Sequence, residues 1–420
     1  MIWPRGRRSP HRSSSKEPPI PRLPQGTAFA GLVVTFTVVM IGTTMPTPMY
    51  AVYQSELGFS PIVQTVIFAV YAVGVLAALL LFGRWSDLLG RRPLLLAGVG
   101  FSLASSIVFV LAGPVPVLLV GRLLSGISAG IFAGAATAAV IEAAPPSWSS
   151  RSSAVATAAN TGGLGLGPLL AGLAVQFLPA PLHLSFAVHA VAVALCWVLV
   201  LLAPETVTPT RRPRLRPQKI AVPAEVRPVF VSAATAGFAG FAVLGLFTAI
   251  SPRIVSEVLG NSNHAVAGLL SFLLLGASAA AQLGLRRFDT DRTLTLGCVL
   301  LIAGILLVGL SVATASFPEL VIGALIAGVG QGMSFSKGLA TVNARVDPAQ
   351  RAGVTSSYFV VLYVAISLPV VGVGAASMAW GLVTAAITFA VAVAVLAAVA
   401  LTALLILQRR GAQQPDAVSG

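Results

Sequence analysis

Long apolar runs dominate the hydrophobic pattern of this 420-residue chain. The hydrocarbon core of a bilayer is about 30 Å thick, and an apolar helix of roughly 20 residues crosses it. Runs of this length must form helices, because lipid offers the backbone no hydrogen-bond partners and a membrane barrel would show short alternating segments instead. The predicted spans are 28–53, 62–83, 93–112, 116–140, 153–176, 184–203, 228–250, 264–285, 293–313, 317–340, 353–376 and 378–407. We therefore predict an all-α membrane protein with twelve transmembrane helices.

The spans fall into two groups of six, at 28–203 and 228–407. A Pro-rich and Arg-rich segment at 204–227 separates the groups and predicts a flexible cytoplasmic linker. The polar stretches 1–27 and 408–420 predict disordered cytoplasmic tails, and the first of them lacks the pattern of a signal peptide. We expect two six-helix bundles of nearly equal size.

The composition excludes several classes of protein. Hydrophobic residues make up 56% of the chain and charged residues 9%, whereas a soluble domain carries about 25% charged residues. A soluble enzyme, a disordered protein and a disulfide scaffold are therefore excluded. Cys196 and Cys298 lie inside apolar runs and indicate neither a zinc site nor a disulfide framework. We expect no metal, no cofactor and no catalytic residues.

The net charge of +14 follows a topological pattern. If both termini are cytoplasmic, 23 of the 26 basic residues lie in cytoplasmic segments, as the positive-inside rule requires. The exceptions are Arg122, Arg253 and Lys337. We interpret the excess charge as a topology signal and expect no nucleic-acid partner. The many Arg and Ala residues favour a bacterial plasma membrane protein, which we expect to be a monomer.

The loop after the second span has the sequence Gly-Arg-Trp-Ser-Asp-Leu-Leu-Gly-Arg-Arg. An Asp and two Arg at helix ends can form charge-assisted pairs with a helix terminus and with a nearby acid, for which the fourth span offers a Glu at the same membrane side. We therefore expect this group to join helix ends at one side of the membrane. The group comprises Asp87, Gly90, Arg91, Arg92 and Glu142.

The span 153–176 contains a Gly-Pro run formed by Gly163, Gly167, Pro168 and Gly172. Proline removes a helical hydrogen bond and clashes one turn back, so it bends or loosens the helix. Pro46 and Pro48 similarly predict a break near the outer end of the first span. Glycines at this spacing also allow a close approach to a neighbouring helix.

These motifs resemble the major facilitator superfamily over residues 28–407. The loop resembles the family's signature, with Leu88 in place of a basic residue, and the position of Arg122 in the fourth span is also similar. The Gly-Pro run resembles the motif of the proton-coupled antiporter branch, with Ala171 replacing one Gly, and Pro204-Glu205-Thr206 is common in the family. The resemblance implies the major facilitator fold, in which two six-helix bundles rock around a central cavity.

Our hypothesis is that the charged group of Asp87, Arg91 and Glu142 latches the outward-open state and releases as the halves rock. The alternative is that this group only anchors helix ends.

Three candidate functional groups within the predicted spans are Arg122, His189 and Lys337. A charge such as Arg122 costs roughly 2.5–3.5 kcal/mol at this depth, and its counterpart in the second half is Ala324. We propose that Arg122 modulates protonation or binds a polar part of the substrate; the alternative is that it extends to the outer interface. His189 is a candidate for proton exchange. Lys337 either lines the cavity or extends to the cytoplasm.

The predicted cavity is mostly apolar, which suits hydrophobic or amphipathic solutes better than sugars. The alternative is that its apolar side chains face lipid. The candidate lining residues are Phe132, Asn160, Thr161, Phe238, Phe241, Phe247, Gln331, Met333 and Lys337.

We predict an exporter of small hydrophobic or amphipathic compounds that works by alternating access in the lipid bilayer, in exchange for protons. The twelve acidic residues all lie in loops, tails or near helix ends, so coupling depends on Glu142, on His189 or on the resemblance. Alternatives are an importer or uniporter of a sugar or amino acid, a membrane subunit of another assembly, and a membrane-embedded enzyme. The last two are disfavoured, because the chain has no nucleotide-binding motif and its loops are short and poor in acids.

Overall fold

The computed structural model describes residues 23–83, 85–210, 217–218, 220–285, 287–347 and 350–412. Within these ranges twelve helical segments are long and apolar enough to cross a membrane, which confirms the predicted all-α membrane fold. The tail residues 1–22 and 413–420, and most basic residues of the predicted linker, lie outside the described residues.

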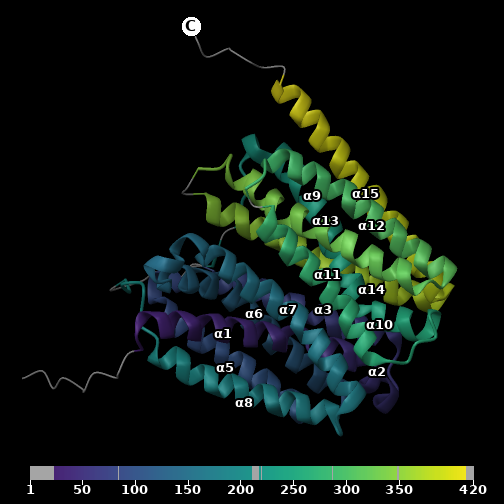
Figure 1. Ribbon diagram of the computed structural model, residues 1–420, viewed down its shortest axis with the longest axis horizontal. Helices are drawn as coiled ribbons and strands as arrows, with labels where there is room; N and C mark the ends of the chain where they lie inside the picture. The colour runs from purple at the N-terminus through teal and green to yellow at the C-terminus, as the bar shows by residue number, and fades with distance from the viewer. Residues whose placement is uncertain are drawn as a thin grey trace, which may run out of the picture.

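The first half contains the helices that Figure 1 draws in purple to teal. They are α1 (Gln25–Thr44), α2 (Pro46–Leu57), α3 (Pro61–Phe82), α4 (Trp85–Leu89), α5 (Arg91–Val110), α6 (Val115–Ala143), η1 (Pro146–Arg151), α7 (Ser152–Phe177) and α8 (Pro181–Leu202). The second half contains η2 (Ala224–Val226), α9 (Arg227–Ala249), α10 (Ser251–Arg253), η3 (Ile254–Val258), α11 (His264–Gly284), α12 (Thr290–Thr314), α13 (Phe317–Asn343), α14 (Arg351–Trp380) and α15 (Leu382–Ala412).

Each half has extensive contacts among its own helices. In the first half α6 packs on α3 and α5, and α7 packs on α1; in the second half α13 packs on α11 and α12, and α15 packs on α12. The two halves meet through α7 against α11 and α3 against α14 (Figure 1). We call the end where α1 begins and α15 ends the linker end, and the opposite end the far end.

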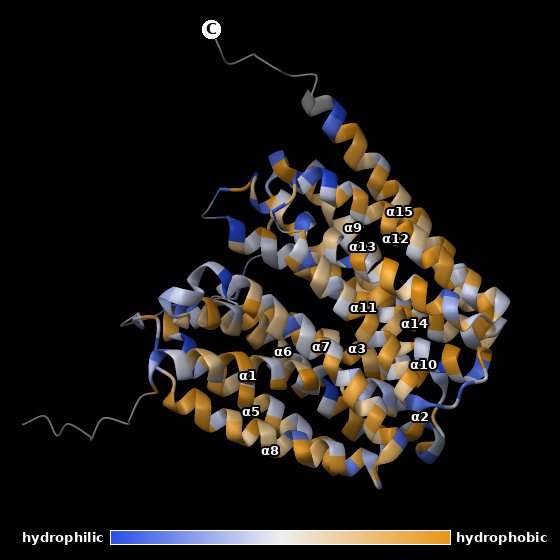
Figure 2. Cartoon of the chain, viewed as in Figure 1, coloured by the Kyte–Doolittle hydropathy of each residue, from blue (hydrophilic) through white to orange (hydrophobic). Residues whose placement is uncertain are grey.

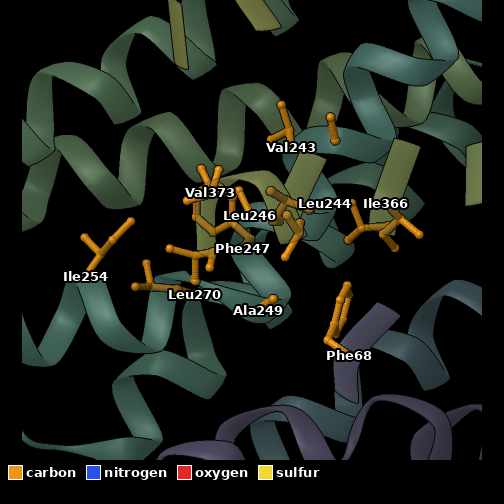
Figure 3. Close-up of a cluster of buried hydrophobic side chains, with 14 of the residues drawn as sticks. Phe68, Val243, Leu244, Leu246, Phe247, Ala249, Ile254, Leu270, Ile366 and Val373 are labelled. Carbon is orange, nitrogen blue, oxygen red and sulfur yellow. The ribbon is translucent and has the colours of Figure 1, made fainter. Parts of the chain in front are cut away.

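Hydrophobic residues predominate along the helices of both halves, and hydrophilic residues are frequent at the ends of the helices (Figure 2). One buried cluster, with Phe36, Val75 and Phe132 among its members, lies within the first half. A larger cluster runs from the second half into the far end of α2 and α3, where Phe68 approaches Leu244 and Ile366 (Figure 3). Because this cluster takes residues from both halves, it helps to close the far end.

Prolines explain several helix starts, because proline fits the first turn without losing a helical hydrogen bond. The predicted break near Pro46 and Pro48 is found: α1 ends at Thr44 and α2 begins at Pro46.

The turn between the last two spans lies a few residues beyond the predicted boundary at 376–378. Helix α14 continues to Trp380 and the chain turns at Gly381, whose φ of 80° favours glycine. Apolar residues run through this turn without a polar marker, so hydropathy cannot locate it.

Part of the predicted linker is bound to the first half. The backbone N–H of Thr210 donates to the carbonyl of Leu88 at 2.8 Å, and that of Gln218 donates to Leu80 at 2.6 Å. The described part of this segment therefore lies against the linker end of α3 and α4.

Candidate functional site

A cavity of about 120 Å³ lies between the halves, near the middle of the bundle. Helices α1, α2, α3, α6 and α7 of the first half and α9, α11, α13 and α14 of the second half form its wall. Of the predicted lining residues, Asn160, Thr161, Phe241 and Gln331 belong to this wall. Six aromatic residues contribute to the wall: Phe68, Tyr71, Phe241, Phe335, Phe359 and Tyr363.

Arg122 also lines this cavity and is only 1% exposed. Its guanidinium lies inside the bundle: Nη1 donates to the carbonyl of Thr43 at 2.6 Å, and Cζ lies 4.6 Å from the ring centroid of Tyr71 and 5.8 Å from that of Phe68. Cation–π contacts offset part of the cost of desolvating the charge. Its Nε is buried without a hydrogen-bond partner.

Uncharged polar groups occupy the opposite side of the cavity. Ser278 Oγ donates to Gln331 Oε1 at 2.6 Å, and Gln282 Nε2 donates to Ser278 Oγ at 3.1 Å. On the first half, Thr44 donates to the carbonyl of Leu164 at 2.8 Å, whereas the hydroxyl of Thr47 is buried without a partner. Both halves thus present hydrogen-bonding groups to one space.

The other five predicted lining residues lie outside this wall. Phe132 packs on Phe36 with ring centroids 6.0 Å apart, and Phe247 and Met333 are buried within the helix packing. Lys337 donates to the carbonyl of Phe288 at 2.7 Å near the linker end, and Phe238 is half-buried on α9. When a helix is apolar on all sides, hydropathy does not show how the helix is rotated about its axis. It therefore cannot distinguish the face that lines a cavity from the face that packs on other helices.

His189 is buried in the first half, where α8 meets α1 and α5. Its Nε2 donates to the carbonyl of Val38 at 3.0 Å, so in the neutral ring Nδ1 accepts from Ser106 Oγ at 2.7 Å. The ring occupies the space beside Gly42, where a Cβ would lie 2.2 Å from the imidazole. His189 therefore lies behind the cavity wall rather than on it.

The structure brings the charged residues of the signature loop together at the linker end. Arg91 pairs with Asp87 at 2.5 Å and with Glu142 at 2.8 Å, and its Nη1 also donates to Ser86 Oγ at 2.7 Å. All of these partners come from the first half. A polar cluster thus joins the ends of α4, α5 and α6, and the neighbouring Arg92 follows Arg91 in the first turn of α5.

Glu205 completes this cluster, although sequence reasoning did not select it as a site residue. Its carboxylate accepts from the backbone N–H of Arg91 at 2.8 Å and of Arg92 at 3.0 Å, which satisfies two donors at the start of α5. Gly90 allows this approach, because its φ is 104° and a Cβ there would lie 2.5 Å from the carboxylate. The Pro-Glu-Thr sequence after the sixth span is the sequence feature that could have indicated Glu205 as a site residue.

The Gly-Pro run packs α7 against two neighbours. Gly163 and Gly167 lie against the backbone of α1, where a Cβ would come within 2.7 Å of a carbonyl oxygen. Gly172 lies against α11, with its Cβ position 2.6 Å from the carbonyl oxygen of His264. In turn, a Cβ at Gly268 of α11 would lie 2.3 Å from the carbonyl oxygen of Pro168. The run therefore determines how closely the two halves approach.

The halves touch at the far end and part at the linker end. At the far end, Gln64 Nε2 donates to the carbonyl of Ala249 at 3.2 Å and His264 N–H donates to Gln176 Oε1 at 3.1 Å, both across the two halves. At the linker end, a second cavity of about 250 Å³ separates α3, α5 and α6 from Arg351 and Thr355 of α14. This arrangement leaves the linker end the more open of the two.

No three His, Cys, Asp or Glu side chains group into a metal-binding arrangement within the part of the chain that the structure describes. The site consists of an apolar cavity, one buried cation and neutral polar groups.

Comparisons with known proteins agree on the family. The model of the Major Facilitator Superfamily matches residues 29–369. The chain is 30% identical over 170 residues to a tetracycline resistance protein, class E, from Escherichia coli, and 34% identical over 137 residues to a tetracycline resistance protein, class D, from Salmonella ordonez. These matches cover 40% and 32% of this chain, and they span only 42% and 33% of the length of the relatives.

Solved structures with the same fold include three transporters. The human organic anion transporter MFSD10 aligns with a TM-score of 0.63 and 19% identity over 91% of this chain and 100% of its own. A bacterial homologue of the lysosomal transporter Spinster aligns with 0.69 and 16% identity over 94% and 99%. The nucleoside transporter NupG aligns with 0.69 and 12% identity over 90% and 99%.

Proposed function

Because this chain belongs to the major facilitator superfamily, we propose that it exports small hydrophobic or amphipathic compounds in exchange for protons. The observation that carries the proposal is the cavity of about 120 Å³, whose wall takes residues from both halves. A ligand held there contacts both bundles, so its binding energy depends on how the bundles are oriented. Rocking of the halves then exposes the same site to one side of the membrane at a time.

Two observations support an outward direction and an apolar substrate. The aromatic cavity wall favours compounds with large apolar surfaces. The partial relatives in two bacteria are tetracycline resistance proteins, and a transporter confers resistance most directly by moving the compound out of the cell. The Gly-Pro run of α7 lies at the contact between the halves, where it would shape the cavity and limit leak.

The proposal assigns proton coupling to the first half. His189 is a buried imidazole, a side chain suited to proton exchange, and its neighbour α1 also carries the Thr43 carbonyl that accepts from Arg122. A change at the imidazole can therefore reach the cavity through one helix. Glu142 is the alternative, at the linker end.

The charged cluster around Arg91 is proposed as a latch between the two states. Its contacts all lie within the first half here, while a cavity separates it from the start of α14. If the linker end closes, Asp87 can approach the first turn of α14, where unpaired N–H groups attract an anion. The latch would then hold the state that is open at the far end.

We place the protein in the plasma membrane of a bacterium, as a monomer with both termini and the linker end in the cytoplasm. The support is the distribution of basic residues, which gather at the linker end, as at Arg91, Arg92 and Arg151.

The direct test is transport by the full chain reconstituted into proteoliposomes with an imposed pH gradient. A panel of dyes and antibiotics is supplied, and we expect gradient-dependent movement of at least one of them against its concentration. Liposomes without protein should show no such movement, and a proton ionophore should abolish it in the proteoliposomes. Movement of none of these compounds, together with uptake of a sugar, nucleoside or amino acid, would contradict the export proposal.

A further inference from the structure

Among the described residues that line the cavity between the halves, Arg122 is charged and the others are uncharged. From this we infer that the substrate is an amphipathic organic anion, with an apolar body and one carboxylate or similar group that binds Arg122. The inference rests on the proposed transport function and specifies the substrate class for the same site.

The first argument is the incomplete pairing of Arg122. An ion taken out of water loses its hydration, and a buried charge is normally paired with an opposite charge. Here the guanidinium has the carbonyl of Thr43 at 2.6 Å and the ring of Tyr71 at 4.6 Å, both of them neutral groups. Since no carboxylate lines the cavity, the ligand is the group that can supply the missing negative charge.

The second argument is the set of polar atoms left without partners. Arg122 Nε and Thr47 Oγ1 are both buried, both lack a hydrogen-bond partner and both belong to residues of the cavity wall. The guanidinium N–H groups can only donate, and the threonine hydroxyl can donate as well. The unfilled hydrogen-bonding capacity on this side therefore suits an acceptor, and a carboxylate can accept from guanidinium N–H groups in a two-point contact.

The opposite polar side of the cavity does not compete for the anion. The Gln331 oxygen already accepts from Ser278, and the Ser278 oxygen already accepts from Gln282. These groups are uncharged and two hydrogen bonds engage them with one another, so they form a neutral wall. The charged and unfilled side of the cavity belongs to the first half, and the apolar body of the ligand would reach the aromatic groups Phe241 and Phe335 of the second half.

This arrangement also disfavours other substrates. A cationic amphiphile would meet a fixed positive charge in a site of low dielectric, with no acid to offset the repulsion. A neutral polar compound would leave the charge of Arg122 uncompensated. A small inorganic anion would pair with Arg122, but it would leave the aromatic wall without contacts.

The test compares three compounds that share one aromatic body: naphthylacetate, naphthylacetamide and naphthylethylammonium. Equilibrium binding to the purified full-length protein is measured by calorimetry, with sodium chloride titrated alone as a fourth ligand. We expect naphthylacetate to bind at least roughly tenfold more tightly than the amide, and the ammonium compound to bind most weakly. Equal binding of the three, tighter binding of the ammonium compound, or no binding of the carboxylate would overturn the inference.

Two variants locate the effect. Arg122→Gln should remove the preference for the carboxylate over the amide, and Thr47→Val should reduce it by a smaller factor. The matched control is Arg253→Gln, which removes a cation paired with Glu257 outside the cavity wall and should leave the preference unchanged. A preference that persists in Arg122→Gln would contradict the assignment. The comparison in the wild-type protein stays decisive if Arg122→Gln does not fold.

The outcome is separable from that of the transport assay. Carboxylate-selective binding without pH-driven movement would reject the proposed function and retain the site. Export of dyes driven by a pH gradient, without carboxylate selectivity, would retain the proposed function and reject the anion site. Saturable chloride binding with no preference among the three aromatic compounds would indicate an inorganic anion site and overturn the inference.

Discussion

At the scale of single residues, the account depends on how a few polar side chains are satisfied at membrane depth. Arg122 and His189 are both buried in the first half, but only Arg122 reaches the cavity. Sequence identifies such residues because a polar group in an apolar run is conspicuous. It cannot show what they contact, because Thr43 and Val38, their backbone partners, carry no mark in the sequence.

Replacing the buried imidazole tests its role in coupling. In His189→Gln we expect transport driven by a pH gradient to fall by roughly tenfold or more, while exchange of compound in the absence of a gradient continues. The reason is that glutamine retains hydrogen-bonding groups but cannot take up a proton. The control is His183→Gln, at an exposed position of the same helix. Unchanged gradient-driven transport in His189→Gln would assign coupling elsewhere, with Glu142 the next candidate.

The capping carboxylate makes a separate residue-scale prediction. Glu205→Gln should weaken the two bonds to Arg91 and Arg92 N–H and lower the free energy of unfolding by about 1 kcal/mol, because an anion at a helix start is better than a neutral amide. The measurement is the thermal unfolding midpoint in detergent, compared with Glu225→Gln, which neutralises an exposed acid. Equal midpoints for both variants would show that the cap contributes little.

At the scale of helices, apolar length predicted the elements and proline predicted the interruption between α1 and α2. What sequence could not provide is the orientation of each helix about its axis. Phe132 and Phe247 were expected at the cavity because they are large and apolar, but that property suits packing as well, and both are fully buried in it. Gln331 and Asn160 were placed better because a polar group at this depth needs a polar surrounding.

The contact between α7 and α11 predicts a conformational effect of a single methyl group. In Gly172→Ala the new Cβ would lie 2.6 Å from the carbonyl oxygen of His264, so the far ends of the two helices must separate, at a cost of about 1–3 kcal/mol to the closed arrangement. We expect faster labelling of a cysteine placed at Ala267, which is buried near the far end of α11, in this variant. The control is Gly162→Ala on the same helix, where a Cβ meets nothing within 4 Å. Equal labelling rates in the two variants would contradict the role of this contact.

At the scale of the whole molecule, two six-helix groups were predictable because a polar segment divides the chain evenly. The sequence did not predict which end of the molecule is closed and which is open. The halves touch at Gln64 and Ala249, and a cavity separates them beside Arg351. Both features are properties of tertiary packing, which no local sequence pattern encodes. The same holds for the bound linker residues, since Thr210 pairs through its backbone alone.

The proposed latch makes a prediction at this scale. Asp87→Asn should disfavour the state in which the linker end is closed, because the anion available to the first turn of α14 is lost. Contacts of this kind are worth about 0.3–1 kcal/mol, so we expect a two- to fivefold shift in the ratio of states, measured by labelling a cysteine placed at Thr355. Asp291→Asn removes the same charge from the linker end of the second half and is the control. If both variants label equally, Asp87 is not a latch.

The most direct measurement of the central claim follows both ends of the molecule at once. Spin labels are placed at Ser149 and Asp289 across the linker end, and in a second sample at Pro179 and Ser262 across the far end; all four positions are exposed, and the native Cys196 and Cys298 are buried. Distance distributions are recorded in lipid nanodiscs for the wild type and for Gly172→Ala. Alternating access predicts that the far-end distance lengthens in the variant while the linker-end distance shortens in an equal fraction of molecules. A far-end distance that lengthens while the linker-end distribution stays unchanged would contradict it.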